Sequence, residues 1–457
     1  MNNDSNDIVF ITEWPIESES IDLECSPSKK RRKSTEITID KPDIALARWW
    51  RRNKASLRFD NLQETVVSPS TRLRRIAKSR EGRQFLLDQL ELLKNSFSPW
   101  DHLLKAFYLD KLGFYEDASK EIKTSIENGC DDGEALWLRE KLWRQTQADS
   151  KREETRKKNW ETTPRLPAQV KKRSACNFSY EDFFKNFAST RTPVIISGGA
   201  WEMTESKWNL AYIKKIAGDK TVTLKRPVGD SAEWARLENG RRTTIKDFID
   251  SIESGKDKEY LFDWSLPIHC PKLAEELTIP KFFSGDLLQR TAPGSLYRDS
   301  WPSLFVAPAG IHSELHIDAF GSNFWMAIFE GKKKWSFFLP DDVPLLYPTY
   351  DHSLDPIFEV QVCNPNYAMY PLFALATVQE CVLEPGDILF VPAGCPHHVE
   401  NLTDTVAISA NFVDESNFDL VKRELGAQGH IDAKAKELLR QLESETFDDV
   451  SSGVDLK

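Results

Sequence analysis

The spacing of apolar positions changes twice along the chain. Between about residues 78 and 160 these positions recur every three or four residues, which is the period of a helix packed on one face. Two such faces are formed by Phe85, Leu86, Leu90 and Leu93 and by Leu103, Leu104, Phe107 and Tyr108. The same spacing returns in the segment 417–445. The pattern therefore predicts an α-helical region near the N-terminus and helices near the C-terminus.

Between these helical regions the chain is made of short apolar or alternating runs. Examples are TPVIISGGA, EYLFDW, FWMAIFEG, GDILFVPAG and TVAISANF, which are separated by Gly, Pro and Asp. Many short strands without helical repeats between them favour a β-sandwich or a jelly roll. We therefore predict a tail at 1–41, a helical domain at 42–165, a mainly β domain at 174–416, C-terminal helices at 417–445 and an acidic tail at 446–457.

The helical region allows two interpretations. The stretch WDHLLKAFYLDKLGFYEDASKEIKTSIENG resembles one tetratricopeptide hairpin. Stacked repeats of this kind need about three copies for stability, and only one is clear here. An ordinary helical cap, or a platform for a partner, fits the same residues, so the role of this region stays open.

Composition limits the compartment. The chain has no apolar run of the ~18 residues that a membrane span requires. Its first residues, MNNDSNDIVF, lack the basic flank and apolar stretch of a secretory signal. The seven cysteines are scattered and include no CxxC pair, which favours a reducing compartment and argues against a structural zinc site. We therefore expect no membrane association.

The net charge of −10 is distributed unevenly. Residues 1–174 carry 34 Lys and Arg against 29 Asp and Glu, whereas residues 175–457 carry 27 against 42. The first part includes a run of five cations: Lys29, Lys30, Arg31, Arg32 and Lys33. Such a run is typical of a nuclear localisation signal. It predicts an import receptor as a partner and a location in the nucleus, and also in the cytoplasm. A solvated linker or a general polyanion contact is the alternative interpretation.

The segment HSELHID at 312–318 contains a candidate metal site. If its end is extended, His316 and Asp318 project to the same side, because side chains at i and i+2 share one face of a strand. The segment GDILFVPAGCPHHVENL offers a third ligand in His397 or His398. Two imidazoles and one carboxylate on one side of a metal are typical of non-haem Fe(II) oxygenases, although an HxD triplet alone also occurs by chance.

Three segments carry a family resemblance. HIDAFGSNFWMAIFEGKKKWSFFLPDD, GDILFVPAGCPHHVENL and VAISANF resemble the JmjC family of iron- and 2-oxoglutarate-dependent oxygenases, over about residues 175–415, and most of all its small protein hydroxylases. The resemblance implies a double-stranded β-helix (a jelly roll, or cupin) as the catalytic domain. It also implies Fe(II) as the metal, with 2-oxoglutarate and O2 as cosubstrates.

The resemblance also assigns residues. The metal ligands it implies are His316, Asp318 and His397. The residues it implies around the cosubstrate are Lys333, which pairs with the distal carboxylate, and Ser313, Tyr260, Asn401 and Asn411. No catalytic group is implied beyond these ligands.

Several neighbouring residues fit the family pattern less simply. Strict alternation along a strand would turn Ser313 away from His316, so its assignment requires a turn or a bulge between them. His312 and His398 receive no role. Met326 stands where a related hydroxylase has an asparagine near 2-oxoglutarate.

These features together predict an oxygenase that hydroxylates a side chain of a protein substrate. The acidic charge of residues 175–457 favours a basic peptide, such as a histone or a ribonucleoprotein segment. A methyl-lysine or methyl-arginine demethylase is the alternative, because the same ligands support both reactions. A jelly-roll scaffold without catalysis is a third hypothesis, and the C-terminal helices are candidates for pairing two subunits.

Overall fold

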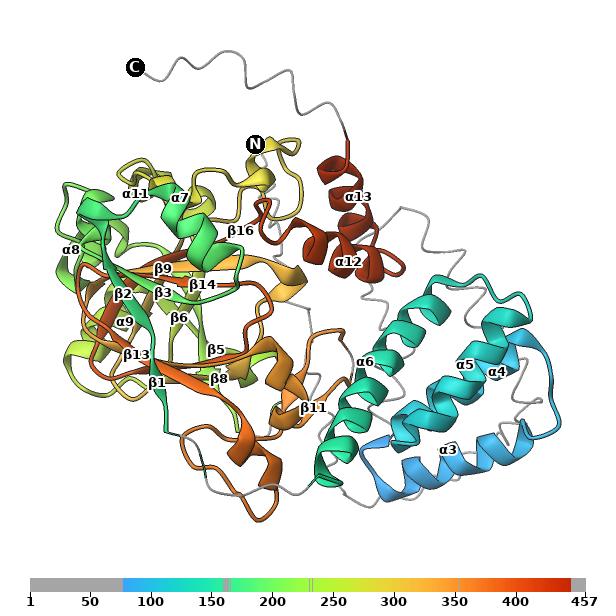
Figure 1. The fold of residues 1–457 in the computed structure, drawn as a ribbon. Coiled ribbons are helices and arrows are strands. Elements are labelled where there is room, and N and C mark those ends of the chain that lie inside the picture. Colours follow the sequence, from blue (N-terminus) through green and yellow to red (C-terminus); the bar gives the residue numbers. More distant parts are fainter. Residues whose placement is uncertain are drawn as a thin grey trace, which may run out of the picture. The chain divides into compact units, whose positions relative to one another are not determined.

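The computed structural model describes residues 77–158, 164, 166–229, 231, 233–351 and 353–444 (Figure 1). The chain divides into two compact units, Met1–Cys130 and Asp131–Lys457. The cationic run Lys29–Lys33 and the predicted tails 1–41 and 446–457 lie outside the described residues.

The first unit contains the helices α3 (Arg80–Leu92), α4 (Pro99–Leu112) and α5 (Tyr115–Glu127), of which α4 and α5 form a hairpin. Gly113 ends α4 in the left-handed conformation (φ 86°), which lets the chain turn directly into α5. The Ser125 hydroxyl donates to the Pro99 carbonyl at 2.6 Å and ties the two helices together. A single hairpin fits both interpretations of this region.

The second unit contains two large sheets. The five-stranded sheet has the order β1 (Ala168–Gln169), β13 (Val378–Leu383), β10 (Lys333–Phe338), β15 (His397–Asn401) and β8 (His312–His316). The seven-stranded sheet has the order β2 (Lys171–Ser174), β3 (Val194–Ser197), β14 (Ile388–Val391), β9 (Asn323–Glu330), β16 (Thr405–Phe412), β7 (Ser303–Ala307) and β6 (Leu261–Ser265). Two short pairs are added, β4 (Thr221–Pro227) with β5 (Leu237–Thr244) and β11 (Pro348–Thr349) with β12 (Ile357–Phe358).

Apolar side chains fill the space between the two sheets. Phe324 and Met326 of β9 share this core with Trp335 and Phe337 of β10. The alternate β9 residues, such as Trp325, belong to a second core on the other face of the seven-stranded sheet. That face is covered by α7 (Tyr180–Phe183), α8 (Leu210–Ala217), α9 (Ile245–Glu253), α10 (Leu266–His269) and α11 (Pro271–Ala274).

Three longer helices complete the second unit: α6 (Gly133–Arg156), α12 (Phe418–Gln428) and α13 (Ala433–Leu442). Arg144 of α6 forms an ion pair with Glu424 of α12 at 2.8 Å, so α6 lies in the unit that holds the sheets. The predicted fold class, a mainly β jelly roll with N-terminal and C-terminal helices, is confirmed. In the described part of the chain, every helix is too short or too polar to cross a membrane.

Candidate metal centre

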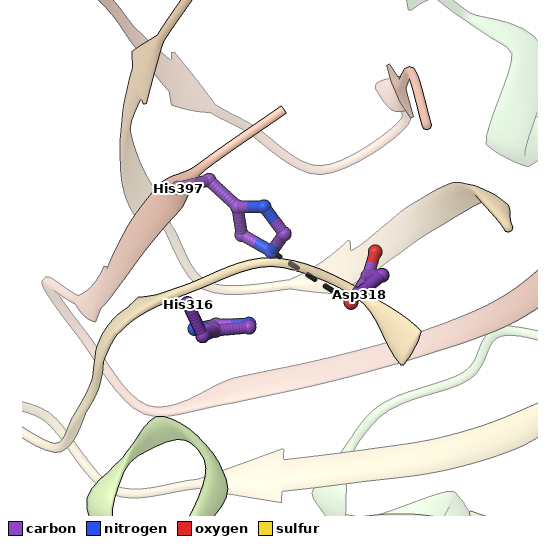
Figure 2. A group of neighbouring side chains, drawn as sticks. All are labelled: His316, Asp318 and His397. Carbon is purple, nitrogen blue, oxygen red and sulfur yellow. Dashed lines mark ion pairs between the residues drawn. The ribbon is translucent and has the colours of Figure 1, made fainter. Parts of the chain in front are cut away.

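Three candidate ligands meet at the end of the five-stranded sheet. His316 ends β8 and is the direct ladder partner of His397, which begins β15. Asp318 follows two residues after His316 and faces both rings (Figure 2). One ligand atom of each residue lies within 4.8 Å of the others, and His397 Nε2 is 4.0 Å from Asp318 Oδ1. The structure thus brings together the three residues that the sequence motif predicted.

Backbone carbonyls orient both imidazoles. His316 Nδ1 lies 2.6 Å from the Glu314 carbonyl, and His397 Nδ1 lies 3.0 Å from the Cys395 carbonyl. A proton on Nδ1 satisfies each bond and leaves Nε2 as a lone-pair donor, which is the usual arrangement of metal-binding histidines. Burial lowers the pKa of both rings, that of His397 to about 4, so they are neutral near pH 7.

In the part of the chain that the structure describes, the carboxylate of Asp318 has no cationic partner. Burial raises its pKa to about 7, with Asp263 and Asp355 nearby adding to the effect. Among the described residues no lysine or arginine forms an ion pair with Asp318, and His397 is neutral. A divalent cation would supply the missing charge. The donor set of two imidazoles and one carboxylate therefore fits Fe(II).

A β-bulge places Ser313 on the inner side of β8. The ladder pairs His316 with His397 and Ser313 with Val399, so three steps along β8 oppose two along β15. The extra residue reverses the alternation and brings Ser313 to the same side as His316. Ser313 is buried, as that position requires. The geometry meets the condition set by the sequence, while a bond from Ser313 to a cosubstrate stays a prediction.

Lys333 is a buried cation at the other end of the same interior. Its exposed fraction is 0%, and its Nζ contacts Asn401 Oδ1 at 2.6 Å and Tyr260 Oη at 3.3 Å. The Asn401 amide also accepts from Thr405 Oγ1 and donates to the Ile311 carbonyl. Burial lowers the pKa of Lys333 to about 7, and within the described ranges no carboxylate pairs with it. An anionic ligand would satisfy this ammonium group.

The two lysines beside it point the other way. Lys332 Nζ lies 2.6 Å from Glu384, and Lys334 Nζ lies 3.0 Å from Glu380, both on the outer side of the sheet. Of these three lysines, Lys333 is therefore the one whose side chain faces the interior.

Asn411, His312 and His398 do not belong to the cluster of three candidate ligands. The Asn411 amide donates to Ser322 Oγ at 2.8 Å, and its predicted contact with a cosubstrate is untested. His312 forms an ion pair with Glu314 at 3.2 Å. His398 faces the outer side of β15, where its ring stacks on that of His312 at 6.0 Å.

Residues that no motif indicated also surround the site. Trp234 lies in the turn Trp234–Arg236, between β4 and β5; its indole N–H donates to the Ile317 carbonyl at 3.0 Å. Its ring lies 4.3 Å from that of His316. Trp335 and Ser409 face the interior from β10 and β16. Alternation counted from Lys333 and Asn411 would have found the last two, whereas no local signal identifies Trp234.

Comparison with known proteins identifies a family to which the chain is similar. The family described as "Cupin-like domain" matches residues 180–418. The chain is 31% identical to "Lysine-specific demethylase 8" of Danio rerio over 240 residues, which are 50% of this chain and 55% of that protein. It is 28% identical to "2-oxoglutarate and iron-dependent oxygenase JMJD4" of Mus musculus over 278 residues, 55% of this chain and 64% of that protein. It is 27% identical to "Bifunctional arginine demethylase and lysyl-hydroxylase psr-1" of Caenorhabditis elegans over 292 residues, 60% of this chain and 70% of that protein. The chain thus spans less than two thirds of the length of the first two relatives.

Proposed function

Because the chain belongs to the cupin-like domain family, we propose that it is an Fe(II)- and 2-oxoglutarate-dependent oxygenase that hydroxylates a side chain of a protein substrate. One observation carries the proposal. A single interior holds a buried carboxylate with two neutral imidazoles at one end and a buried ammonium group at the other, and neither charge has a counter-charge among the described residues. A divalent metal and a dicarboxylate together would satisfy both ends.

Each residue then has a defined task. His316, Asp318 and His397 would hold the metal from one side and leave its remaining positions open. Lys333 would bind the distal carboxylate, with Tyr260 and Asn401 holding its ammonium group in place. When bound, iron and 2-oxoglutarate supply the oxidation of a C–H bond by O2, coupled to decarboxylation of 2-oxoglutarate to succinate.

The substrate decides which product forms. Hydroxylation of a side-chain carbon gives a stable alcohol, whereas hydroxylation of an N-methyl group ends in loss of the methyl. Relatives are named for both outcomes, so a protein demethylase is the second candidate. The acidic charge of residues 175–457 favours a basic peptide in either case.

The test is turnover of 2-oxoglutarate to succinate by the purified protein with Fe(II) and ascorbate, beside His316→Ala. Basic peptides, methylated and unmethylated, are added and analysed by mass spectrometry. Succinate formation that disappears in the variant is the expected result. A mass gain of one oxygen identifies a hydroxylase, and loss of a methylene unit identifies a demethylase. A wild-type protein that binds neither metal nor 2-oxoglutarate would favour the scaffold hypothesis.

Location and assembly form a second part of the proposal. The run Lys29–Lys33 would direct the chain to the nucleus through an import receptor. A fluorescent fusion should lose nuclear accumulation when the five cations are replaced by alanine. The helices α12 and α13 would pair two subunits, and light scattering on the purified chain tests whether it is a dimer.

A further inference from the structure

The outer face of the five-stranded sheet carries four side chains of types that bind transition metals. They are His312 and Glu314 of β8, His398 of β15, and Cys363, which lies in the segment after β12. His312 and Glu314 share this face because they are two positions apart on one strand. The cluster of three ligands in the interior uses none of the four.

The bulge in β8 brings the side chains of the two strands together. Two residues of β8, Glu314 and Leu315, stand opposite the single residue His398 of β15. His398 follows the inward-facing His397 and so faces outward, beside the Glu314 carboxylate. The imidazole rings of His312 and His398 lie 6.0 Å apart between their centroids. The four side chains are therefore gathered at one place on the sheet.

Within this cluster the side chains form two pairs, and each pair has the separation of two ligands on one zinc ion. Cys363 Sγ lies 3.6 Å from His398 Nε2, and His312 Nε2 lies 3.2 Å from Glu314 Oε1. Zinc bonds of about 2.3 Å to sulfur and about 2.0 Å to nitrogen or oxygen, at tetrahedral angles, place S and N about 3.6 Å apart and N and O about 3.3 Å apart. Two imidazoles on one such ion have centroids about 5 Å apart, so the two rings would approach each other by about 1 Å.

Charge and accessibility also suit a divalent cation. When bound, a thiolate, a carboxylate and two neutral imidazoles together cancel its charge. His398 is 3% exposed, whereas Cys363 is exposed, so solvent reaches a cluster in which one ligand is already held by the protein. The absence of a CxxC pair argues against a site built on neighbouring cysteines, but these four ligands come from three separate segments.

We propose that His312, Glu314, Cys363 and His398 bind Zn(II) on the outer face of the sheet. The inference is independent of the proposed function, because it uses neither the interior ligands nor 2-oxoglutarate. A bound ion would fasten the segment around Cys363 to β8 and β15, the two strands whose inner faces carry the metal-binding histidines.

The test is a titration of the metal-free full-length protein with Co(II), which replaces zinc and reports its ligands by absorption. A thiolate bound to Co(II) gives an intense charge-transfer band in the near ultraviolet. The interior cluster cannot give this band, because it has no cysteine ligand. Cys363→Ser removes the thiolate, and His312→Ala removes one imidazole. Cys176→Ser is the matched control, since Cys176 is the other exposed cysteine among the described residues.

We expect the band in the wild type and in C176S, and its complete loss in C363S. In H312A it should require at least about tenfold more Co(II), because even residues that only support a metal ligand contribute that much to affinity. Excess Zn(II) should remove the band by displacing Co(II). A wild-type protein without the band, or a band that persists in C363S, would overturn the inference.

Thermal unfolding separates loss of the site from loss of the fold. Because Cys363 is exposed, the Tm of metal-free C363S should equal that of the wild type. If C363S does not fold, the Co(II) affinity of H312A decides. None of these results depends on binding of 2-oxoglutarate, so failure of this inference leaves the proposed function intact.

Discussion

The substitution Lys333→Met tests whether the buried lysine lowers folding stability and serves to bind an anionic ligand. The side chain is fully buried, and burial lowers its pKa from 10.5 to about 7. Methionine has a similar length and no charge. If the lysine is present for an anionic ligand, the substitution should make the metal-free protein more stable while abolishing 2-oxoglutarate binding.

The magnitude follows from linkage. The unfolded lysine holds its proton up to pH 10.5, whereas the folded one releases it near pH 7. At about 1.4 kcal/mol per pH unit, folding at about pH 7.4 costs the wild type about 4 kcal/mol at this residue. The lost bonds to Asn401 and Tyr260 offset about 1 kcal/mol each, so we expect K333M to be more stable by about 2 kcal/mol.

The sign of the pH dependence is also fixed. Between about pH 7 and 10 the unfolded chain binds one more proton than the folded chain, so the wild type gains stability as the pH rises. Its disadvantage against K333M should shrink by about 2 kcal/mol between about pH 7.4 and pH 9. Urea unfolding of the metal-free proteins measures both quantities.

The matched control is Lys332→Met. Lys332 is half exposed and pairs with Glu384, an interaction that solvent screens and that contributes little to stability. This variant should change neither the pH dependence nor the 2-oxoglutarate Kd. A K333M protein that is less stable than wild type at neutral pH, yet binds 2-oxoglutarate normally, would refute the reasoning and make Lys333 a structural cation.

Three further substitutions test the surrounding groups. Asn401→Asp places a carboxylate beside the Lys333 ammonium group, where the amide oxygen now lies at 2.6 Å, so the internal ion pair should raise the calorimetric Kd of 2-oxoglutarate about tenfold or more. An unchanged Kd would show that Lys333 does not meet the cosubstrate. Trp234→Phe keeps an aromatic ring beside the ligands but removes the bond to the Ile317 carbonyl, and should weaken Co(II) binding about tenfold, as followed by the visible absorption of the ion. Equal affinity in this variant would restrict Trp234 to packing. Asp318→Asn should abolish Co(II) binding at the cluster of three ligands at neutral pH and raise the stability of the metal-free protein, because the buried carboxylate has no cationic partner among the described residues. Retained binding would contradict its role as a ligand.

The parts of this molecule that local patterns determine were predictable from sequence. Short apolar or alternating runs such as FWMAIFEG and TVAISANF became the central strands β9 and β16. The prediction that His316 and Asp318 project to the same side required only that the chain between them be extended. The inward direction of Lys333 followed from alternation within β10, since Lys332 and Lys334 then had to face outward.

Contacts between distant segments were not predictable in this way. Trp234 reaches the Ile317 carbonyl across 83 positions of sequence, and nothing near Trp234 marks it as part of a site. Asn401 matched a family position, but only the structure shows that its amide already bonds Lys333, Thr405 and Ile311. The amide therefore helps to hold the lysine in place, while a direct contact between Asn401 and a cosubstrate stays a prediction.

Predictions from local sequence patterns fail next to the metal ligands. Alternation would have turned Ser313 outward, and a bulge in β8 reverses it. Phe320, two residues after Asp318, and Ala235, next to Trp234, both adopt left-handed backbone conformations, with φ of 47° and 51°. Such conformations cost about 1 to 3 kcal/mol each in non-glycine residues, and they persist only where the surrounding structure enforces them. These two residues lie beside His316 and Asp318, and the two buried charges of the site have no counter-charge among the described residues. Folding stability is therefore lowered at a place where a metal and an anion would restore it.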